Sequence, residues 1–395
     1  MSHALLDEML RRLADADGSD LHIKVGSPPR IRVNGALRKL EDAPSITPDL
    51  TAEMAGAIMR DDIAEHFEIS NDADFAYGIP HVGRFRVNAF RQRGTVGLIF
   101  RRVRTTSATF AELGLPEVVA RLATEHRGLV LVTGPTGSGK TTTLAAMIDY
   151  INDSRECHIV TIEDPIEVLH RDKLASINQR EIGFDTDSFA SAMRAAMRQD
   201  PDVIFVGEMR DQETVAAALS AAETGHLVLS TLHTIDATET INRIVDFFPP
   251  HQQHQVRVAM AGSLKGTVCQ RLVQTADGEG RVAALEVMVM NGRIQQCIIE
   301  PGKGDIHEIV ADGEYYGMQT FDQSLAKLYE RGAIDLRGAM TAASNPHDLK
   351  VMLQQRGLLA ATSRPTPEAQ PAGPPQAPGQ DVSSVTPPGM AVTHR

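Results

Sequence analysis

The stretch GLVLVTGPTGSGKTTTLAAM, residues 128–147, constrains the fold of this chain more than any other part of its sequence. Within it, GPTGSGKT at 134–141 matches the phosphate-binding pattern G-x-x-x-x-G-K-[ST] at every position. An apolar run of strand type precedes the motif, and the residues after it have the i, i+3, i+4, i+7 spacing of a helix with one buried face: Leu144, Met147, Ile148 and Ile151. The pattern predicts an α/β fold in which a buried strand leads into a phosphate-binding turn and then a helix.

The residue types in this turn are those that bind a nucleoside triphosphate. Gly137 and Gly139 let the backbone approach a phosphate and direct its N–H groups inward, and the following helix adds the partial positive charge of its amino terminus. Lys140 is placed to reach the β- and γ-phosphates, and the Thr141 hydroxyl can ligate Mg²⁺. We therefore predict a site for ATP and Mg²⁺ made of Gly134, Pro135, Thr136, Gly137, Ser138, Gly139, Lys140, Thr141 and Thr142.

Hydrolysis also requires carboxylates near the γ-phosphate, and a parallel sheet delivers such residues at the carboxyl ends of its strands. HIVTIEDPIE, at 158–167, ends a predicted strand at Glu163, and PDVIFVGEMRD, at 201–211, ends another at Glu208. We assign Glu163 to polarising the attacking water. We assign Glu208 to orienting Mg²⁺, directly or through one of its water ligands.

Histidines and arginines are further candidates for contacts with the phosphates. TGHLVLSTLHT, at 224–234, is a predicted strand bracketed by His226 and His233, and its polar end is placed to sense the γ-phosphate. Arg194 and Arg198 lie one helical turn apart ahead of the strand of Glu208, and the strand-like runs of the N-terminal region carry Arg84, Arg86, Arg91, Arg93, Arg101 and Arg102. A small arginine-bearing domain ahead of a nucleotide-binding core suggests that positive charge reaches a phosphate across an interface.

Periodicity and composition divide the chain into five parts. Residues 1–103 combine a short helix at 1–12, β-like runs and a helical stretch at about 49–68, which is an α+β pattern, and the polar segment 104–116 connects this region to the next. Residues 117–270 alternate apolar strands with helices, and 271–358 read mainly as helices, with GRVAALEVMVM as one β-like insertion. Residues 359–395 are rich in Pro and poor in large apolar side chains, so we expect a disordered tail.

Charge and cysteine content exclude several classes of protein. A net charge of -12 argues against a protein whose main role is to bind nucleic-acid backbones. The three cysteines are far apart and form no C-x-x-C pair, which predicts neither a disulfide framework nor a zinc site. The first residues lack the apolar block of a secretory signal, and no apolar run approaches the roughly 18–20 residues that span a bilayer. We expect a cytoplasmic protein.

Four segments, in order, resemble the motifs of the secretion-superfamily ATPases: GPTGSGKT the Walker A motif, TIEDPIE the Asp box, RQDPDVIFVGEMRD the Walker B motif and TGHLVLSTLHT the His box. With GSDLHIKVGSPPRIRVNG, GRFRVNAF and GMQTFDQSL, the chain is similar to PilT-type type IV pilus retraction ATPases from about residue 5 to 358.

The resemblance implies a PAS-like N-terminal domain, a RecA-like ATPase core and a helical C-terminal subdomain. It implies a homohexamer at the inner face of the cytoplasmic membrane that retracts a pilus for twitching motility through an inner-membrane platform protein. By motif position, Glu163 would be the catalytic glutamate, Glu208 the Walker B acid, and His226 and His233 the His-box pair. The interface arginines would be Arg86, Arg101, Arg194 and Arg198.

One segment departs from the retraction ATPases, which carry AIRNLIRE after the β-like insertion. Here GRIQQCIIE, at 292–300, keeps Ile294, Ile298 and Glu300 but has Gln295 and Ile299 where arginines stand. The segments 317–334 and 345–353 and the long tail look more like the accessory, PilU-type ATPases. An accessory or regulatory subunit with little turnover, which binds a related pilus ATPase, is therefore the alternative. A RecA-like nucleic-acid translocase is disfavoured by the net charge of -12 and by 4% aromatic residues.

Overall fold

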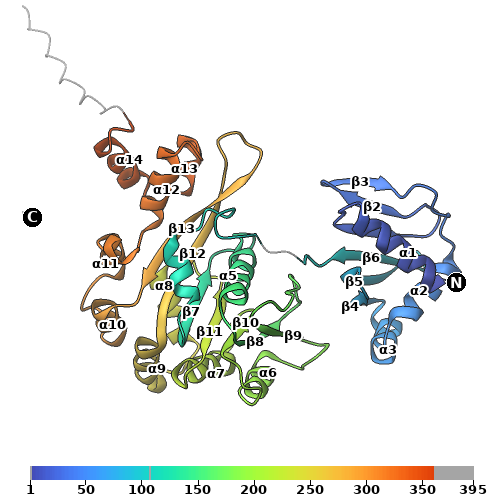
Figure 1. The fold of residues 1–395 in the computed structure, drawn as a ribbon, viewed down its shortest axis with the longest axis horizontal. Coiled ribbons are helices and arrows are strands. Elements are labelled where there is room, and N and C mark those ends of the chain that lie inside the picture. Colours follow the sequence, from blue (N-terminus) through green and yellow to red (C-terminus); the bar gives the residue numbers. More distant parts are fainter. Residues whose placement is uncertain (1, 106–107, 360–395) are drawn as a thin grey trace, which may run out of the picture.

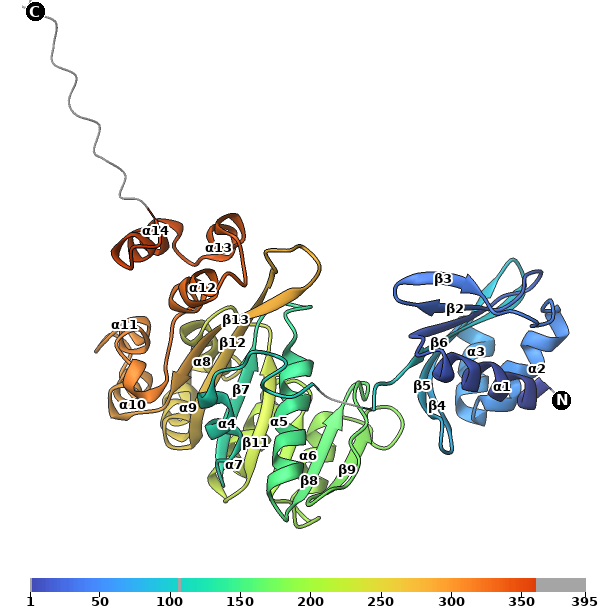
Figure 2. The ribbon, with the colours of Figure 1, turned by 45° about the horizontal axis from the view of Figure 1, so that its top comes forward.

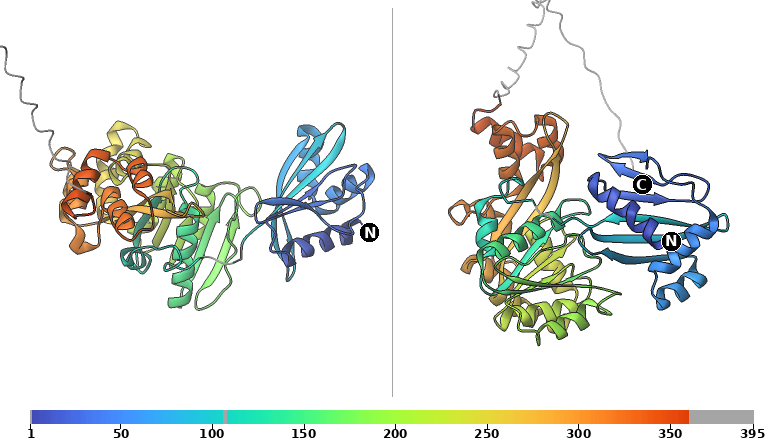
Figure 3. Two further views of the ribbon diagram at one scale, coloured as in Figure 1. Left: turned by 90° about the horizontal axis from the view of Figure 1, so that it is seen from above. Right: turned by 45° about the vertical axis from the view of Figure 1, so that its right-hand side comes forward.

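The computed structural model describes residues 2–105 and 108–359, and these form two separate β-sheets with their helices. Figure 1 shows the N-terminal sheet in blue beside a larger part that runs from green to red. The other views keep the same division (Figure 2 and Figure 3), so the chain passes once from the first sheet to the second.

The N-terminal part is a six-stranded sheet with three helices. Its strands pair antiparallel throughout, in the order β3–β2–β1–β6–β5–β4. The buried face of α1 forms one apolar cluster with Phe85 and Phe100 of the sheet. The α+β pattern predicted for this region is therefore confirmed. The elements are α1 Ser2–Asp15, β1 Asp20–Ile23, β2 Arg30–Val33, β3 Ala36–Lys39, α2 Pro48–Ile58, α3 Asp61–Ser70, β4 Asp72–Ile79, β5 Gly83–Gln92 and β6 Thr95–Arg102.

The helical stretch predicted at 49–68 is two helices rather than one. The backbone is extended at Met59 and Arg60, with ψ of 138° and 160°, so α2 ends there and α3 begins. The side chain of Thr47 accepts the N–H of Leu50 at the start of α2. Asp61 and Asp62 lie in the first turn of α3, where negative charge is favourable to the helix dipole. Each helix therefore has its own start signal.

The larger part is built on a seven-stranded mixed sheet in the order β13–β12–β7–β11–β10–β8–β9. All pairs are parallel except β12 with β13, which confirms the α/β class. Leu129 and Leu131 of β7 pack into a core with α6 to α9, while Val130 and Val132 pack into a second core with α4 and α5. Helices therefore cover both faces. The elements are α4 Glu117–Ala123, β7 Gly128–Thr133, α5 Lys140–Ser154, β8 His158–Glu163, β9 Ser176–Glu181, α6 Phe189–Ala196, β10 Val203–Val206, α7 Gln212–Glu223, β11 Leu227–Leu232, α8 Ala237–Asp246, α9 Pro250–Ser263, β12 Leu264–Gln274 and β13 Arg281–Val289.

The sheet extends further along the chain than the sequence predicts. The predicted end of the core at residue 270 falls inside the eleven-residue strand β12, which pairs with β7 on one side through residues 264–269 and with β13 on the other through residues 266–274. The core sheet therefore reaches Val289, and the region predicted to be mainly helical begins after it. β9, a polar strand at the sheet edge, is not predicted from the sequence.

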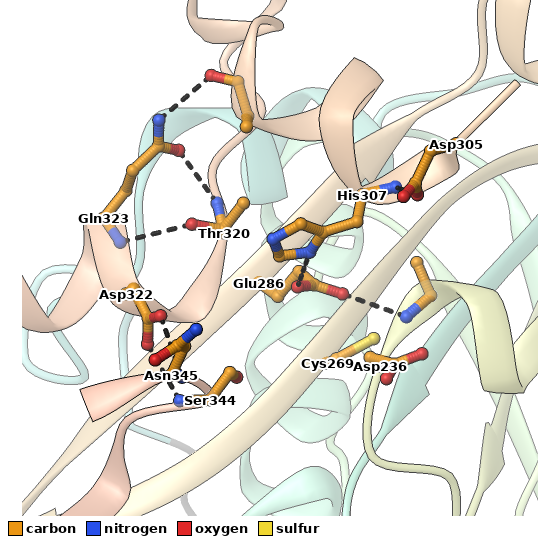
Figure 4. A network of polar contacts seen from close by, with 12 residues as sticks. Asp236, Cys269, Glu286, Asp305, His307, Thr320, Asp322, Gln323, Ser344 and Asn345 are labelled. Atoms are coloured by element: carbon orange, nitrogen blue, oxygen red, sulfur yellow. Dashed lines mark hydrogen bonds and ion pairs between the residues drawn. The ribbon is translucent and has the colours of Figure 1, made fainter. Parts of the chain in front are cut away.

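Short helices follow β13 and complete the described chain: α10 Gly292–Ile299, α11 Ile306–Ala311, the 3₁₀ turn η1 Glu314–Tyr316, α12 Phe321–Glu330, α13 Leu336–Ala342 and α14 Pro346–Gln355. Asp322, which is buried on α12, accepts the N–H groups of Ser344 and Asn345 at 2.8 and 3.1 Å and so fixes the chain at the start of α14 (Figure 4). The predicted disordered tail, apart from its first residue, lies outside the described residues.

The two parts touch at β9 and the segment beside it. Arg84 of β5 donates to Glu181 of β9, with 3.0 Å between Nη2 and Oε2. The guanidinium groups of Arg60 and Arg84 both lie over the ring of Phe184, at 4.6 and 5.3 Å from its centroid. The carbonyl oxygen of Arg104 accepts the N–H of Leu169 at 2.8 Å, so the chain leaving the first sheet pairs with the second part.

Candidate functional site

The phosphate turn lies between the buried strand β7 and the long helix α5, as predicted. Gly134 and Gly139 have φ of 145° and 91°, and a Cβ on Gly134 would come within 2.3 Å of the carbonyl oxygen of Gln270. Both positions therefore require glycine, because β12 packs directly beneath the turn. The Thr143 hydroxyl, one turn into α5, donates to the Gln270 side chain at 2.8 Å and ties the helix to the same strand.

The Lys140 ammonium group points back into the turn rather than into solvent. Its Nζ donates to the carbonyl oxygens of Gly134 and Pro135, at 2.8 and 3.2 Å, and lies 3.5 Å from Nδ1 of His233. Burial lowers the pKa of Lys140, while the nearby charges of Glu208 and Glu167 act in the opposite direction. The positive charge of Lys140 is thus held at the amino end of α5, where the helix dipole also favours an anion.

The Ser138 side chain provides evidence that the turn is shaped for a ligand. Ser138 is 3% exposed, and its hydroxyl has no hydrogen-bond partner among residues 2–105 and 108–359. A buried hydroxyl without a partner is costly, and a phosphate oxygen would satisfy it. Beside it lies an open cavity of about 520 Å³ that reaches across the sheet edge to Glu163, Glu208 and His233. The residues of the turn therefore fit a polyphosphate.

Glu163 ends β8 at the cavity and is 6% exposed. Its Oε1 accepts the hydroxyl of Thr161 at 2.6 Å and Nε2 of Gln179 at 3.1 Å. Burial raises the pKa of Glu163 to about 7, although these two hydrogen bonds lower it. A carboxylate with a pKa near neutral pH is well matched to accepting a proton from water.

Glu208 faces the cavity from the loop after β10, where its carboxylate contacts the side chains of Arg210 and His233. It forms an ion pair with Arg210, and its Oε2 lies 3.5 Å from Nε2 of His233. Arg210 is also 4.0 Å from Asp164. His233 therefore bridges Lys140 and Glu208, which links the phosphate turn to the carboxylate across the cavity. Thr141 lines the same cavity, so its hydroxyl and the Glu208 carboxylate are among the oxygen ligands there that could hold a hydrated Mg²⁺.

The two predicted histidines lie at opposite ends of β11. His233 follows the carboxyl end of the strand at the phosphate turn, whereas His226 precedes its amino end, with Nδ1 3.0 Å from the carbonyl oxygen of Ala221. The six residues of β11 lie between the two histidines, and the seven steps of extended chain from 226 to 233 separate them by roughly 23 Å. Within one chain, the structure brings His233 to the site and does not bring His226 there.

The four predicted interface arginines are likewise away from the cavity of their own chain. Arg86 and Arg101 lie opposite each other on β5 and β6, where they contact Asp74 at 3.9 Å and Asp20 at 2.9 Å. Arg194 forms an ion pair with Glu213, and Arg198 donates to the carbonyl oxygen of Arg194 at 3.0 Å. None of the four lines the cavity.

Two arginines that the sequence analysis did not assign do line the cavity: Arg104, from the segment after β6, and Arg281, the first residue of β13. A second open cavity of about 970 Å³ adjoins the first and shares Gly139, Thr142, Leu272 and Arg281 with it. Its other wall is the segment 111–115. No local motif marks these residues, because packing alone brings the segments together.

Among the helices in residues 2–105 and 108–359, none combines the length and the apolar character needed to cross a bilayer.

Most of the chain is similar to known proteins. The sequence profile described as Type II/IV secretion system protein matches residues 2–314. The chain is 44% identical over 343 residues to the Type IV pilus retractation ATPase PilT of Pseudomonas aeruginosa, which covers 87% of this chain and 99% of that protein. It is 42% identical over 351 residues to the Type IV pilus ATPase PilU of the same bacterium, covering 88% and 91%.

Solved structures of related ATPases also align with most of this chain. The pilus retraction motor PilT with bound ADP aligns with a TM-score of 0.78 at 47% identity, covering 87% of this chain and 98% of that one. The Legionella pneumophila ATPase DotB aligns with a TM-score of 0.73 at 28% identity, covering 90% and 96%.

Proposed function

The chain belongs to the type II/IV secretion system protein family and is an ATPase, and we propose that it is a motor that couples ATP hydrolysis to retraction of a type IV pilus. The observation that carries the proposal is one cavity in which Glu163, Glu208 and His233 face Lys140. The near full-length similarity to a protein named for pilus retraction supports the biological role.

In the proposed reaction, the phosphates of ATP lie in the turn 134–142, and the adjoining second cavity has room for the nucleoside. Glu163 accepts a proton from the water that attacks the γ-phosphate, because it is the buried carboxylate with a pKa near neutral pH. Lys140 and the Ser138 hydroxyl bind phosphate oxygens, and His233 senses the γ-phosphate from the end of β11. Mg²⁺, when bound, neutralises charge on the phosphates. Thr141 and Glu208 would hold it or its water ligands.

We propose that the working form is a homohexamer with PAS-like N-terminal domains and RecA-like cores. The support lies on the first sheet, where Arg86 and Arg101 are direct cross-strand neighbours with 49% and 71% of their side chains exposed. Asp74 and Asp20 already pair with these two arginines, so the support is their exposure and their position side by side, which lets an anion outside the chain contact both. A nucleotide in a neighbouring subunit would supply that anion, and the same interface would bring Arg194, Arg198 and His226 near a second site. The ring would act on an inner-membrane platform protein from the cytoplasmic side.

Counting surface pili by electron microscopy tests the motor role. Cells that lack the gene should carry an excess of pili that fail to shorten and should lose twitching motility, and the wild-type gene should restore both. A gene with Lys140→Ala should restore neither. Bald cells would instead identify a motor for pilus assembly, and the retraction proposal would be wrong.

An accessory role is the second candidate, and α10 is the observation that favours it. Gln295 stands where the retraction ATPases carry arginine, and its Nε2 donates to the carbonyl oxygen of Ala261 at 3.1 Å. Similarity to PilU extends over 88% of this chain. Unchanged piliation in the deletion strain would support this role over the motor. So would a purified protein that shows little ATP hydrolysis dependent on Lys140.

A further inference from the structure

The buried side chain of Glu286 has no assigned part in hydrolysis, yet it lies close to the phosphate turn. Glu286 is on β13, directly opposite Cys269 of β12, and Cys269 is in turn opposite Thr133 of β7. Thr133 is the last residue before the turn. The three residues therefore form one row across the sheet, and Glu286 is two strands away from the turn.

The Glu286 carboxylate is used to hold the amino end of α8. Its Oε1 accepts the N–H of Ala237, the first residue of α8, at 3.0 Å, and Glu286 itself is 4% exposed. A negative charge is favourable there because the first N–H groups of a helix have no partners within the helix. On the other side, Oε2 lies 4.0 Å from Nδ1 of His307 on α11, and the two side chains point toward each other (Figure 4).

The amino end of α8 is tied, in turn, to the residues just after His233. The hydroxyls of Thr234 and Thr240 are 2.6 Å apart in the core, and Glu239 accepts the N–H of Ile235 at 2.8 Å. Three residues, 234–236, separate His233 from α8. The position of His233 between Lys140 and Glu208 therefore depends on where α8 begins.

We propose that Glu286 is a positioning residue for ATP hydrolysis: its buried carboxylate fixes the start of α8 and thereby holds His233 at the γ-phosphate. The inference rests on the proposed role of His233. Burial raises the pKa of Glu286, with the neighbouring Asp236 acting in the same direction and Ala237 N–H, His307 and Arg271 opposing it. The hydrogen bond to Ala237 needs an acceptor oxygen, which both protonation states provide.

The test compares Glu286→Gln, which keeps an acceptor oxygen, with Glu286→Met, which fills the same space without one. Steady-state ATP hydrolysis should give a nearly native kcat for Glu286→Gln. For Glu286→Met, kcat should fall about 10- to 100-fold, as for a misplaced reacting group, with little change in the KM for ATP. The matched control is Asp322→Asn, a buried carboxylate that also accepts backbone N–H groups but lies away from α8, and its kcat should stay within about twofold of native.

The decisive comparison repeats Glu286→Met in a His233→Ala background. If Glu286 acts through His233, the second substitution should add no further loss of kcat, because residues that act as a unit are not additive. Equal losses in both backgrounds would overturn the positioning role while leaving that of His233 intact. A native kcat in His233→Ala alone would instead overturn the proposed role of His233 itself.

A reciprocal variant keeps the proposal testable if Glu286→Met does not fold. Ala237→Pro removes the N–H donor and leaves Glu286 in place, and proline is well tolerated at the first position of a helix. The preceding residue, Asp236, is already extended, with φ of -150° and ψ of 175°, as a residue before proline prefers. This variant should lose kcat as Glu286→Met does, and a native kcat in a folded Ala237→Pro protein would overturn the proposal.

Discussion

The pH dependence of turnover tests the role of Glu163 most directly. Burial raises the pKa of this carboxyl to about 7. A group that accepts a proton from water must itself be ionised, and with this pKa it is ionised in roughly 10% of molecules at pH 6 and roughly 90% at pH 8. We therefore expect kcat to rise about tenfold between pH 6 and pH 8, with its midpoint near pH 7.

The same burial predicts an opposite effect on stability. The folded protein keeps this proton up to about pH 7, whereas the unfolded chain releases it near the ordinary value of 4.5. Between these pH values the unfolded state binds fewer protons, so stability falls as pH rises, by about 3 kcal/mol in total at about 1.4 kcal/mol for each unit of pKa. Glu163→Gln has no charge to bury. Its free energy of unfolding at pH 8 should exceed that of the native protein by up to about 3 kcal/mol, and the difference should vanish below about pH 5.

Two assays on the same pair of proteins check this reasoning. Steady-state hydrolysis from pH 5.5 to 8.5 should show the predicted rise for the native protein and almost no turnover for Glu163→Gln, while a fluorescent ATP analogue should bind both proteins with similar affinity. Urea unfolding at pH 5 and pH 8 measures the stability difference. A flat pH profile for the native protein, or Glu163→Gln that turns over at a native rate, would refute the assignment of Glu163 as the proton acceptor.

Three further substitutions test contacts around the site. Ser138→Ala should raise the stability of the nucleotide-free protein, because it removes a buried hydroxyl with no hydrogen-bond partner among the described residues, and it should weaken ATP binding about fivefold in a titration. Arg210→Gln should lower the Mg²⁺ concentration for half-maximal hydrolysis, because it removes the guanidinium that is paired with Glu208. Arg84→Ala should speed limited proteolysis between the two sheets at low salt, because the ion pair with Glu181 holds them together. An unchanged cleavage rate would show that the contact contributes little.

The phosphate turn and the apolar strands could be predicted because their signals are local. One motif specifies the turn backbone, the lysine and the helix, and continuous apolar runs mark β7, β8, β10 and β11. β12 could not be predicted, because Leu264 follows the last residue of α9 with no turn residue between them. β9, with the sequence SINQRE, is an edge strand with no apolar pattern to mark it.

The site residues that lie in local motifs or at the ends of apolar strands could also be predicted, whereas those brought in by packing could not. Glu163 ends one strand, and Glu208 and His233 follow two others, and the carboxyl ends of these strands meet at one edge of a parallel sheet. Arg104 and Arg281 reach the cavity from segments far apart in the chain, and nothing local to either residue indicates it. The prediction from TGHLVLSTLHT treated His226 and His233 as a pair. Residues at the two ends of one strand lie at opposite edges of the sheet, so only one of the two can reach the site within a single chain.

The short connection between β11 and α8 has a mechanical consequence. Three residues join His233 to α8, and a fully extended stretch from 233 to 237 spans at most about 14 Å. His233 and the first residue of α8 therefore cannot separate by more than this distance. A rearrangement of the C-terminal helices that carried α8 beyond it would have to move His233 as well, and with it the side chain proposed to sense the γ-phosphate.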